Sequence, residues 1–337
     1  MSKRVSLKDI ANKVGVSTAL VSYVLNGLEK EKRVGPEVVK RIREVAGDLN
    51  YKPNQIARSL RKGSTNTIGL IVADIANPFF GQLARIVEDE AGKHNYTVII
   101  GSSDENCVKS ASLIETFLDR QVDGFIIVPS EGCNQEIESL VNKEIPVVLV
   151  DRFLPELSTS YIVLDNFGAT YEAVTHLVAK GYKNIALIAY KSSLVHMQER
   201  IRGYSEAMKD NHLEQAIQIK ELSYNRVKEE IEEGVSKLFD GNNKPDAMIF
   251  STNALSISGL YALKNHKIRV PDDMAIIGFD GNEAFDFFYS PLTFIEQPIE
   301  EMGKESVRVL LDQIKGSKEN VQIELNHRLI LRESTGG

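Results

Sequence analysis

Residues 6–27 read SLKDIANKVGVSTALVSYVLNG, and this stretch predicts two short helices joined by a tight turn. Ser6 followed by Asp9 resembles an N-terminal capping box, with Asp in place of the usual Glu or Gln. Apolar residues then recur at helical spacing: Leu7, Ile10, Ala11 and Val14. Gly15 is suited to end the first helix in a left-handed conformation, and Ser17 is suited to cap the second. Two short helices around a glycine-containing turn are typical of a helix-turn-helix.

The second predicted helix has two unlike faces. At about 100° per residue, its apolar side chains fall on one arc: Leu20, Val21, Val24, Leu25 and Leu28. The complementary arc is expected to be free and offers hydroxyls, an amide, a methyl group and an aromatic ring: Thr18, Ala19, Ser22, Tyr23 and Asn26. A merely solvated face usually carries Lys and Glu, and this one carries neither. Such groups contact base edges and phosphates in the major groove, so this face is predicted to bind DNA.

The charge distribution agrees with this prediction. Residues 1–64 contain 14 Lys and Arg against 6 Asp and Glu, whereas the remaining residues contain 26 against 41. The net charge of −7 therefore hides a basic head on an acidic body. A basic head can contact phosphate while the acidic body stays away from it, although a solvated basic tail has the same composition.

From Thr67 onwards, short apolar runs alternate with amphipathic stretches. The predicted strands are 68–73, 97–101, 124–128, 147–150, 185–190, 247–251, 275–279 and 294–295. Predicted helices between them include 81–94, 111–121, 168–180 and 203–211. Regular alternation of strands and helices predicts parallel sheets with helices on both faces. Ligands bind such sheets in the crevice at the carboxyl ends of the strands.

The residues that follow these strands, together with later polar positions, form the predicted ligand set. They combine carboxylates, amides, an arginine and aromatic rings: Asp74, Phe79, Phe80, Ser130, Asp151, Asp165, Arg200, Thr252, Asn253 and Asp280. This chemistry suits a polyhydroxylated ligand, which needs bidentate hydrogen bonds and an apolar surface for its ring face. Any single Asp at a strand end has the alternative role of capping a turn.

Several of these motifs stand in one register and resemble the lactose-repressor (LacI/GalR) family of transcriptional regulators. The segments that carry the resemblance are 6–11, 15–17, 21–26 and 49–54, continued by Ala57-Arg58-Ser59-Leu60. The resemblance implies that residues 53–62 form a hinge helix that folds on DNA, with Leu60 entering the minor groove. The predicted DNA-contacting set, beyond the free arc of the second helix, is Ser6, Ser17, Asn54, Ala57, Arg58 and Leu60. A flexible linker with an incidental leucine is the alternative.

The resemblance extends to the body, where it implies an effector domain like a periplasmic binding protein. Residues 74–80 match the family's first pocket loop, and Arg200 and Asp280 match its ligand-binding arginine and aspartate. Asp165 matches the crossing into a second lobe. Many family members have Asn-Asp or Asp-Asp where this chain has Thr252-Asn253, which leaves the identity of the effector open.

We therefore predict a multi-domain chain with a small all-α helix-turn-helix head and a two-lobed α/β effector domain built on parallel sheets. The predicted parts are a head at 1–51, a hinge at 52–66, a first lobe at 67–164 and 293–322, and a second lobe at 165–292 and 323–337. The chain is expected to cross between the lobes near Asp165, Pro291 and Val321, and 323–332 is expected to return as one strand. A homodimer on a pseudo-palindromic double-stranded operator is expected, because two heads on a two-fold axis match such a site.

Other functions find less support in the sequence. Phosphate-loop, His-Glu-x-x-His and Gly-x-Ser-x-Gly motifs are absent, which disfavours a two-lobed sugar-metabolising enzyme or kinase and predicts no catalytic residues. Cys107 and Cys133 are far apart and form no CxxC motif, so we expect ordinary thiols, no metal and no cofactor besides a carbohydrate effector. The start of the chain shows no secretory signal and no apolar run is long enough to span a membrane, which favours the cytoplasm over an extracytoplasmic solute-binding protein. A nucleoid-type DNA binder with a degenerate pocket remains as a third alternative.

Overall fold

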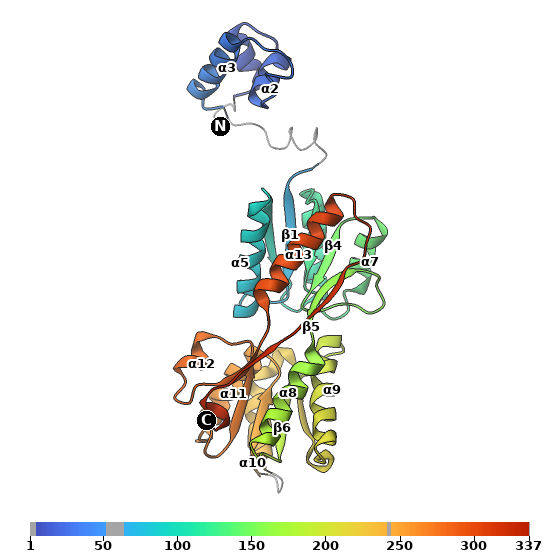
Figure 1. The fold of residues 1–337 in the computed structure, drawn as a ribbon, viewed down its shortest axis with the longest axis vertical. Helices are drawn as coiled ribbons and strands as arrows, with labels where there is room; N and C mark the ends of the chain where they lie inside the picture. The colour runs from blue at the N-terminus through green and yellow to red at the C-terminus, as the bar shows by residue number, and fades with distance from the viewer. Residues whose placement is uncertain (1–4, 52–63, 241–243, 337) are drawn as a thin grey trace. The chain divides into compact units, whose positions relative to one another are not determined.

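The computed structural model describes residues 5–51, 64–240 and 244–336. The chain forms two compact units that divide between Thr65 and Asn66. In the first unit, called the head here, three helices pack around a small apolar core (Figure 1). These helices are α1 (Leu7–Val14), α2 (Thr18–Leu25) and α3 (Pro36–Asp48). Ile10, Val21 and Ile42 are fully buried, one from each helix.

The caps of the head helices confirm the predicted turn. The Ser6 hydroxyl accepts a hydrogen bond from the Asp9 backbone N–H, and the Asp9 carboxylate accepts one from the Ser6 backbone N–H at 2.8 Å. Gly15 ends α1 with a φ of +81°, a conformation that glycine adopts without steric cost. The Ser17 hydroxyl accepts from the Leu20 backbone N–H at 3.2 Å and caps α2. Both serine side chains are thus used in fixing the angle between the two helices.

Ser6→Ala is expected to loosen α1. The substitution leaves one N–H at the helix start without its partner, which typically costs about 1 kcal/mol. Amide hydrogen exchange within α1 should then be faster by roughly fivefold than in the wild type. Lys8→Ala, an exposed change on the same helix, serves as the control, and equal exchange rates in all three proteins would contradict the capping role.

The second unit contains two parallel sheets, one in each lobe. The sheet of the first lobe has the order β11-β5-β4-β3-β1-β2. Its strands are β1 (Thr67–Val72), β2 (Thr97–Ser102), β3 (Gly124–Ile127), β4 (Val147–Val150), β5 (Ser160–Leu164) and β11 (Gln322–Leu325). Helices α5 (Pro78–Lys93) and α13 (Ile299–Ile314) cover one face, and α6 (Cys107–Asp119) and α7 (Asn134–Asn142) cover the other (Figure 1). The continuous apolar strands reflect this burial on both faces.

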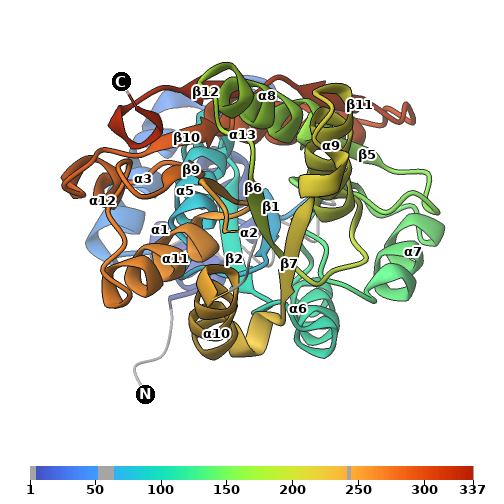
Figure 2. The same ribbon diagram turned by 90° about the horizontal axis from the view of Figure 1, so that it is seen from below.

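The sheet of the second lobe has the order β12-β10-β9-β8-β6-β7. Its strands are β6 (Ile185–Tyr190), β7 (Gln218–Leu222), β8 (Ala247–Phe250), β9 (Ala275–Phe279), β10 (Thr293–Glu296) and β12 (Arg328–Ile330). Helices α8 (Asn166–Ala179) and α9 (Val195–Asp210) cover one face, and α10 (Val227–Asp240) and α11 (Asn253–Asn265) cover the other (Figure 2). The short helix α12 (Glu283–Phe287) follows β9. Strand β12 alone runs antiparallel, against β10.

The chain crosses between the lobes near Asp165, as predicted, but the other two crossings differ from the prediction. Strand β10 pairs with β9, so residues 293–296 belong to the second lobe and the crossing follows at Gln297 rather than near Pro291. Strand β11 pairs with β5, so 322–325 belong to the first lobe and the last crossing lies after Leu325 rather than near Val321. The predicted single strand 323–332 is therefore wrong, because it is two strands in two sheets. A short apolar run predicts a strand but carries no information about which sheet edge accepts it.

In the part of the chain that the structure describes, no helix is both long and apolar enough to cross a membrane.

Candidate ligand cleft and recognition helix

A small cavity of about 60 Å³ lies between the two lobes, where the carboxyl ends of the strands meet. Seven of the predicted ligand residues line it: Asp74, Phe79, Phe80, Asp151, Arg200, Thr252 and Asp280. Nine further residues also line it: Asn77, Glu105, Arg152, Tyr190, His196, Met197, Tyr224, Ala254 and Gln297. The fold thus gathers charged, amide and aromatic groups from both lobes at one point.

Asp151 and Asp280 occupy equivalent positions in the two lobes. Asp151 follows β4 directly and Asp280 follows β9 directly, with φ values of +66° and +57°. Positive φ is costly for a residue with a side chain, although Asp tolerates it better than most. A strained backbone conformation persists only where surrounding contacts enforce it, and such residues are frequent at functional sites. Both carboxylates are thereby turned towards the cleft.

Arg200 is fixed by three contacts within the second lobe. Its Nε donates to Asn166 Oδ1 at 2.8 Å, and its Nη1 donates to the Ser251 carbonyl at 2.6 Å. The guanidinium carbon lies 3.7 Å from the centroid of the Phe279 ring. Burial lowers the pKa of Arg200, while the nearby Asp280 and Asp151 raise it. A guanidinium held in this way presents its remaining donors in a fixed orientation.

Arg152 is held in the same manner within the first lobe. Its two terminal nitrogens donate to the two carboxylate oxygens of Glu105 at 2.6 and 2.7 Å, and Nη1 also donates to the Pro129 carbonyl at 3.2 Å. Burial alone would lower the pKa of Arg152, but Glu105 raises it above its usual value. The bidentate pair keeps a permanent cation at the cleft without leaving it unbalanced.

Among the described residues, hydrogen bonds at two places join the lobes across the cleft. The Tyr224 hydroxyl of the second lobe donates to Asp74 Oδ2 of the first at 3.2 Å. The Glu131 carboxylate of the first lobe accepts from the Ser193 backbone N–H of the second at 3.0 Å. These contacts and the small cavity describe a closed arrangement, because pockets for small molecules usually measure about 300 Å³ or more.

The carboxyl group of Asp280 lines this cleft. Its Oδ1 accepts a hydrogen bond from Gln297 Nε2 at 2.8 Å. Burial raises the pKa of Asp280 to about 7, although Arg200 and Gln297 act in the opposite direction. Burial likewise lowers the pKa of His196 well below its usual value, and the cations Arg152 and Arg200 add to this effect. The imidazole of His196 is therefore neutral near pH 7, and its Nδ1 has no partner in the described part of the chain.

Asp280→Asn is expected to change how stability depends on pH. Because the folded chain holds the Asp280 proton with a pKa of about 7 against an ordinary value of 3.8, this group stabilises the fold below about pH 4 and loses that contribution as the pH rises to about 7. The Tm of the wild type relative to that of the variant should therefore decrease between about pH 4 and pH 7. Calorimetry measures it, with the exposed Glu283→Gln as the control, and a Tm difference that is constant with pH would contradict this assignment.

Three predicted ligand residues do not line the cavity, and each has a structural task. The Ser130 hydroxyl is buried and hydrogen bonds the Ser103 hydroxyl at 3.0 Å. Asp165 caps α8 by accepting from the Gly168 backbone N–H at 2.7 Å. Asn253 donates to the Asp280 carbonyl at 2.6 Å, so it positions that strand end without lining the cleft itself. A position after a strand is thus no guarantee that the side chain reaches the ligand.

Some of these nine further residues carry a usable sequence signal. Gln297 directly follows β10, just as Asp280 directly follows β9. A search for polar residues at the carboxyl ends of strands therefore finds Gln297 once β10 is assigned to the second lobe. Arg152 directly follows Asp151 and shares its position at the end of β4. Tyr224 lies after β7, a strand that has only weak apolar character and was not predicted.

The exposed face of α2 differs from the predicted arc at one position. Thr18, Ala19 and Asn26 are exposed and Tyr23 is half-buried, but Ser22 is buried. Asn26 Nδ2 donates to the Ser22 carbonyl at 2.7 Å and to its hydroxyl at 3.2 Å, which closes the helix end. Placing Ser22 on the free face was therefore wrong.

The remaining predicted DNA contacts divide into two groups. Ser6 and Ser17 are exposed, with their hydroxyls engaged as helix caps. Asn54, Ala57, Arg58 and Leu60 lie outside the residues that the structure describes. Leu28, which was predicted to be in the apolar arc, is 37% exposed because α2 ends at Leu25.

Comparison with known proteins matches both parts of the chain. Residues 6–54 match the model of "Bacterial regulatory proteins, lacI family", and residues 174–335 match that of a periplasmic binding protein-like domain. The chain is 30% identical to catabolite control protein A of Priestia megaterium over 98% of its own length and 99% of that protein. It is 31% identical to a ribose operon repressor of Halalkalibacterium halodurans, covering 98% of this chain and 97% of the relative.

A solved structure is similar to most of the chain. A LacI family transcriptional regulator from Enterococcus faecium with bound ribose aligns with 80% of this chain and 98% of its own, at a TM-score of 0.71 and 28% identity.

Proposed function

Because this chain belongs to the lacI family of bacterial regulatory proteins, we propose that it is a transcriptional repressor whose head binds operator DNA and whose cleft binds a small carbohydrate effector. Its curated relatives are named as regulators, and the chain is not an enzyme. We also propose that the protein binds its operator DNA in the cytoplasm.

The residues that line the cleft support the proposal that the effector is a carbohydrate. Carboxylates at Asp151 and Asp280 accept from sugar hydroxyls, and the fixed guanidinium of Arg200 donates to them. The buried rings of Phe79 and Phe80 offer an apolar surface for one face of a sugar ring. A relative named for the ribose operon and a similar structure with bound ribose support a pentose.

The proposed mechanism couples the cleft to the spacing of two heads. A homodimer would present two copies of α2 to the half-sites of a pseudo-palindrome. The contacts that join the lobes, Tyr224 with Asp74 and Ser193 with Glu131, hold the closed arrangement. An effector that binds the closed lobes more tightly than the open ones shifts the population by its difference in affinity. The shift in lobe closure would then change the distance between the heads.

A thermal-shift screen tests the effector class. Pentoses, hexoses, sugar phosphates and purines are compared at the same concentration, and we expect monosaccharides to raise the Tm. A ligand at 100 times its Kd adds about 2.7 kcal/mol to the stability of the state that binds it. Stabilisation by purines alone would overturn the carbohydrate proposal while leaving the regulator intact. Genomic footprinting tests the operator independently, and the absence of any preferred site would overturn the role in transcription.

A further inference from the structure

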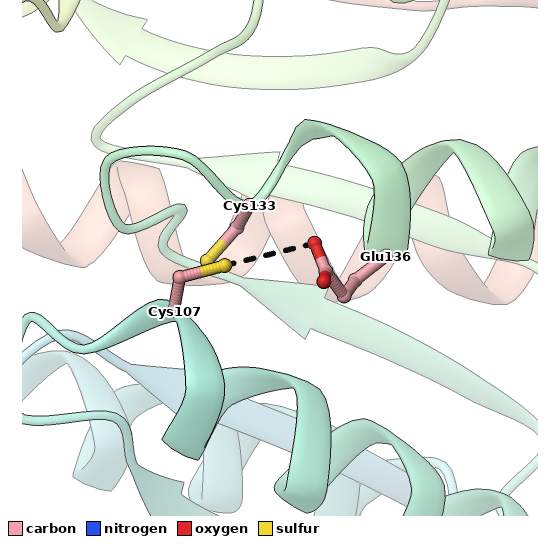
Figure 3. A group of neighbouring side chains, drawn as sticks. All are labelled: Cys107, Cys133 and Glu136. Atoms are coloured by element: carbon pink, nitrogen blue, oxygen red, sulfur yellow. Dashed lines mark hydrogen bonds between the residues drawn. The ribbon is translucent and has the colours of Figure 1, made fainter.

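The two cysteines of the chain, which are far apart in sequence, lie side by side in the first lobe together with a glutamate (Figure 3). Cys107 is the first residue of α6, Cys133 precedes the first residue of α7, and Glu136 lies in the first turn of α7. The two sulfur atoms and a carboxylate oxygen all lie within 4.8 Å of one another. Cys107 Sγ donates to Glu136 Oε2 at 3.6 Å. These three residues are called the thiol cluster below.

The size of the thiol cluster matches the coordination shell of a zinc-like ion. Bond lengths of about 2.3 Å to sulfur and 2.1 Å to a carboxylate oxygen, at tetrahedral angles, place the sulfur and oxygen atoms about 3.6 Å apart. Two sulfurs on the same ion are separated by about 3.8 Å. The measured distance between Cys107 Sγ and Glu136 Oε2 is 3.6 Å. Small rotations of the side chains would therefore bring all three ligand atoms onto one ion.

The surroundings of the thiol cluster supply helix starts and a further oxygen. Both cysteines lie at helix starts, where the helix dipoles stabilise anions. Ser110 is fully buried, and its hydroxyl makes no hydrogen bond of normal geometry in the described part of the chain. That hydroxyl lies close enough to Cys133 to affect the thiol. A buried hydroxyl without a partner is costly, and a metal-bound group would supply one.

We propose that Cys107, Cys133 and Glu136 bind one zinc-like divalent cation through two thiolates and one carboxylate, with water or the Ser110 hydroxyl completing a tetrahedral shell.

Metal binding agrees better with the environment than a redox role does. Burial raises the pKa of Cys107 and raises that of Cys133 to about 12. Thiols that sense oxidants are accessible and have a lowered pKa, so this pair lacks their usual properties. A bound zinc-like cation removes the proton from a coordinating thiol outright. The ion would therefore create the thiolates that the protein alone does not stabilise.

The position of the thiol cluster gives the ion a regulatory effect. The loop before α6 carries Glu105, which holds Arg152 at the cleft. The loop before α7 carries Glu131, which contacts Ser193 of the second lobe. An ion joining the starts of α6 and α7 would fix both loops and so bias the closure of the lobes, independently of which effector occupies the cleft.

Metal titration of the full chain tests the proposal. The protein is reduced with a phosphine, stripped with a chelator, and titrated with Zn²⁺ against a competing chromophoric chelator. We expect one equivalent to bind, and we expect Cd²⁺ to produce the ultraviolet absorption of cadmium thiolates. Cys107→Ser and Glu136→Gln should each weaken Zn²⁺ binding by about 100-fold or more, since even the loss of an outer-shell partner costs 10- to 100-fold.

Glu138→Gln is the matched control, because Glu138 lies on the same helix and is exposed; its affinity for Zn²⁺ should equal that of the wild type. Circular dichroism verifies that each variant is folded, and Cys133→Ala gives a second test should Cys107→Ser lose stability. Failure of the wild type to bind a stoichiometric ion would overturn the proposal. So would unchanged affinity in Cys107→Ser, or Cd²⁺ binding without the thiolate absorption. A disulfide between Cys107 and Cys133 in protein isolated without reductant would instead assign the pair to redox chemistry.

Discussion

Arg200→Ala is expected to remove most of the affinity for the carbohydrate effector while the head keeps its affinity for DNA. Arg200 is buried and anchored by Asn166 and the Ser251 carbonyl, so its free donors point at a fixed place in the cleft. Its loss leaves the carboxylates of the cleft without a cation in the second lobe. Truncating one partner of a buried charged network costs about 2–5 kcal/mol, or roughly 30- to 5,000-fold in Kd. Calorimetric titration with the sugar found in the screen measures this loss.

Two further variants separate ligand binding from folding. Arg202→Ala removes an exposed arginine of the same helix that pairs with Glu199, and it should bind the effector as the wild type does. Arg200→Lys keeps the charge but loses the planar fork, so its affinity should lie between those of the wild type and Arg200→Ala. Normal affinity in a folded Arg200→Ala protein would show that the effector binds elsewhere.

The local features of the head follow from the sequence because they depend on neighbours in the chain. The capping box of Ser6 and Asp9 and the left-handed Gly15 involve residues a few positions apart. The same holds for the Ser17 cap of α2. Ser22 is the exception. Its helical angle places it on the free arc, but Asn26 and the neighbouring core enclose it. Periodicity predicts which way a side chain points and not what later covers it.

The cleft follows from the sequence only in part, because tertiary contacts complete it. Asp151 and Asp280 are predicted from the sequence, because each is a polar residue directly after an apolar strand. The sequence does not predict the contact of Tyr224 with Asp74, since these residues come from different lobes and Tyr224 follows a half-exposed strand. The sequence predicts the thiol cluster even less well, because Cys107 and Cys133 are brought together only by the tertiary fold of the first lobe.

Tyr23→Ala is expected to weaken binding to the cognate operator by about 1–3 kcal/mol, or roughly 5- to 150-fold, and binding to random DNA far less. Tyr23 is half-buried on the face of α2 that also exposes Thr18 and Ala19. The Lys32 amine lies 5.9 Å from the centroid of the Tyr23 ring, so a cation adjoins the residue proposed to read bases. A residue that reads bases contributes to the specific complex alone, whereas a phosphate contact contributes on every sequence.

Binding titrations on operator and random DNA at one salt concentration decide between these roles, since affinity for DNA depends steeply on salt. Tyr23→Phe tests whether the hydroxyl or the ring carries the effect. Lys13→Ala, on the exposed side of α1, is the control for charge, and its losses on the two DNAs should be equal because a lysine contacts phosphates without regard to sequence. Equal losses for Tyr23→Ala on both DNAs would leave Tyr23 as a structural or phosphate contact, and base reading by α2 would then rest on Thr18 and Ala19 alone.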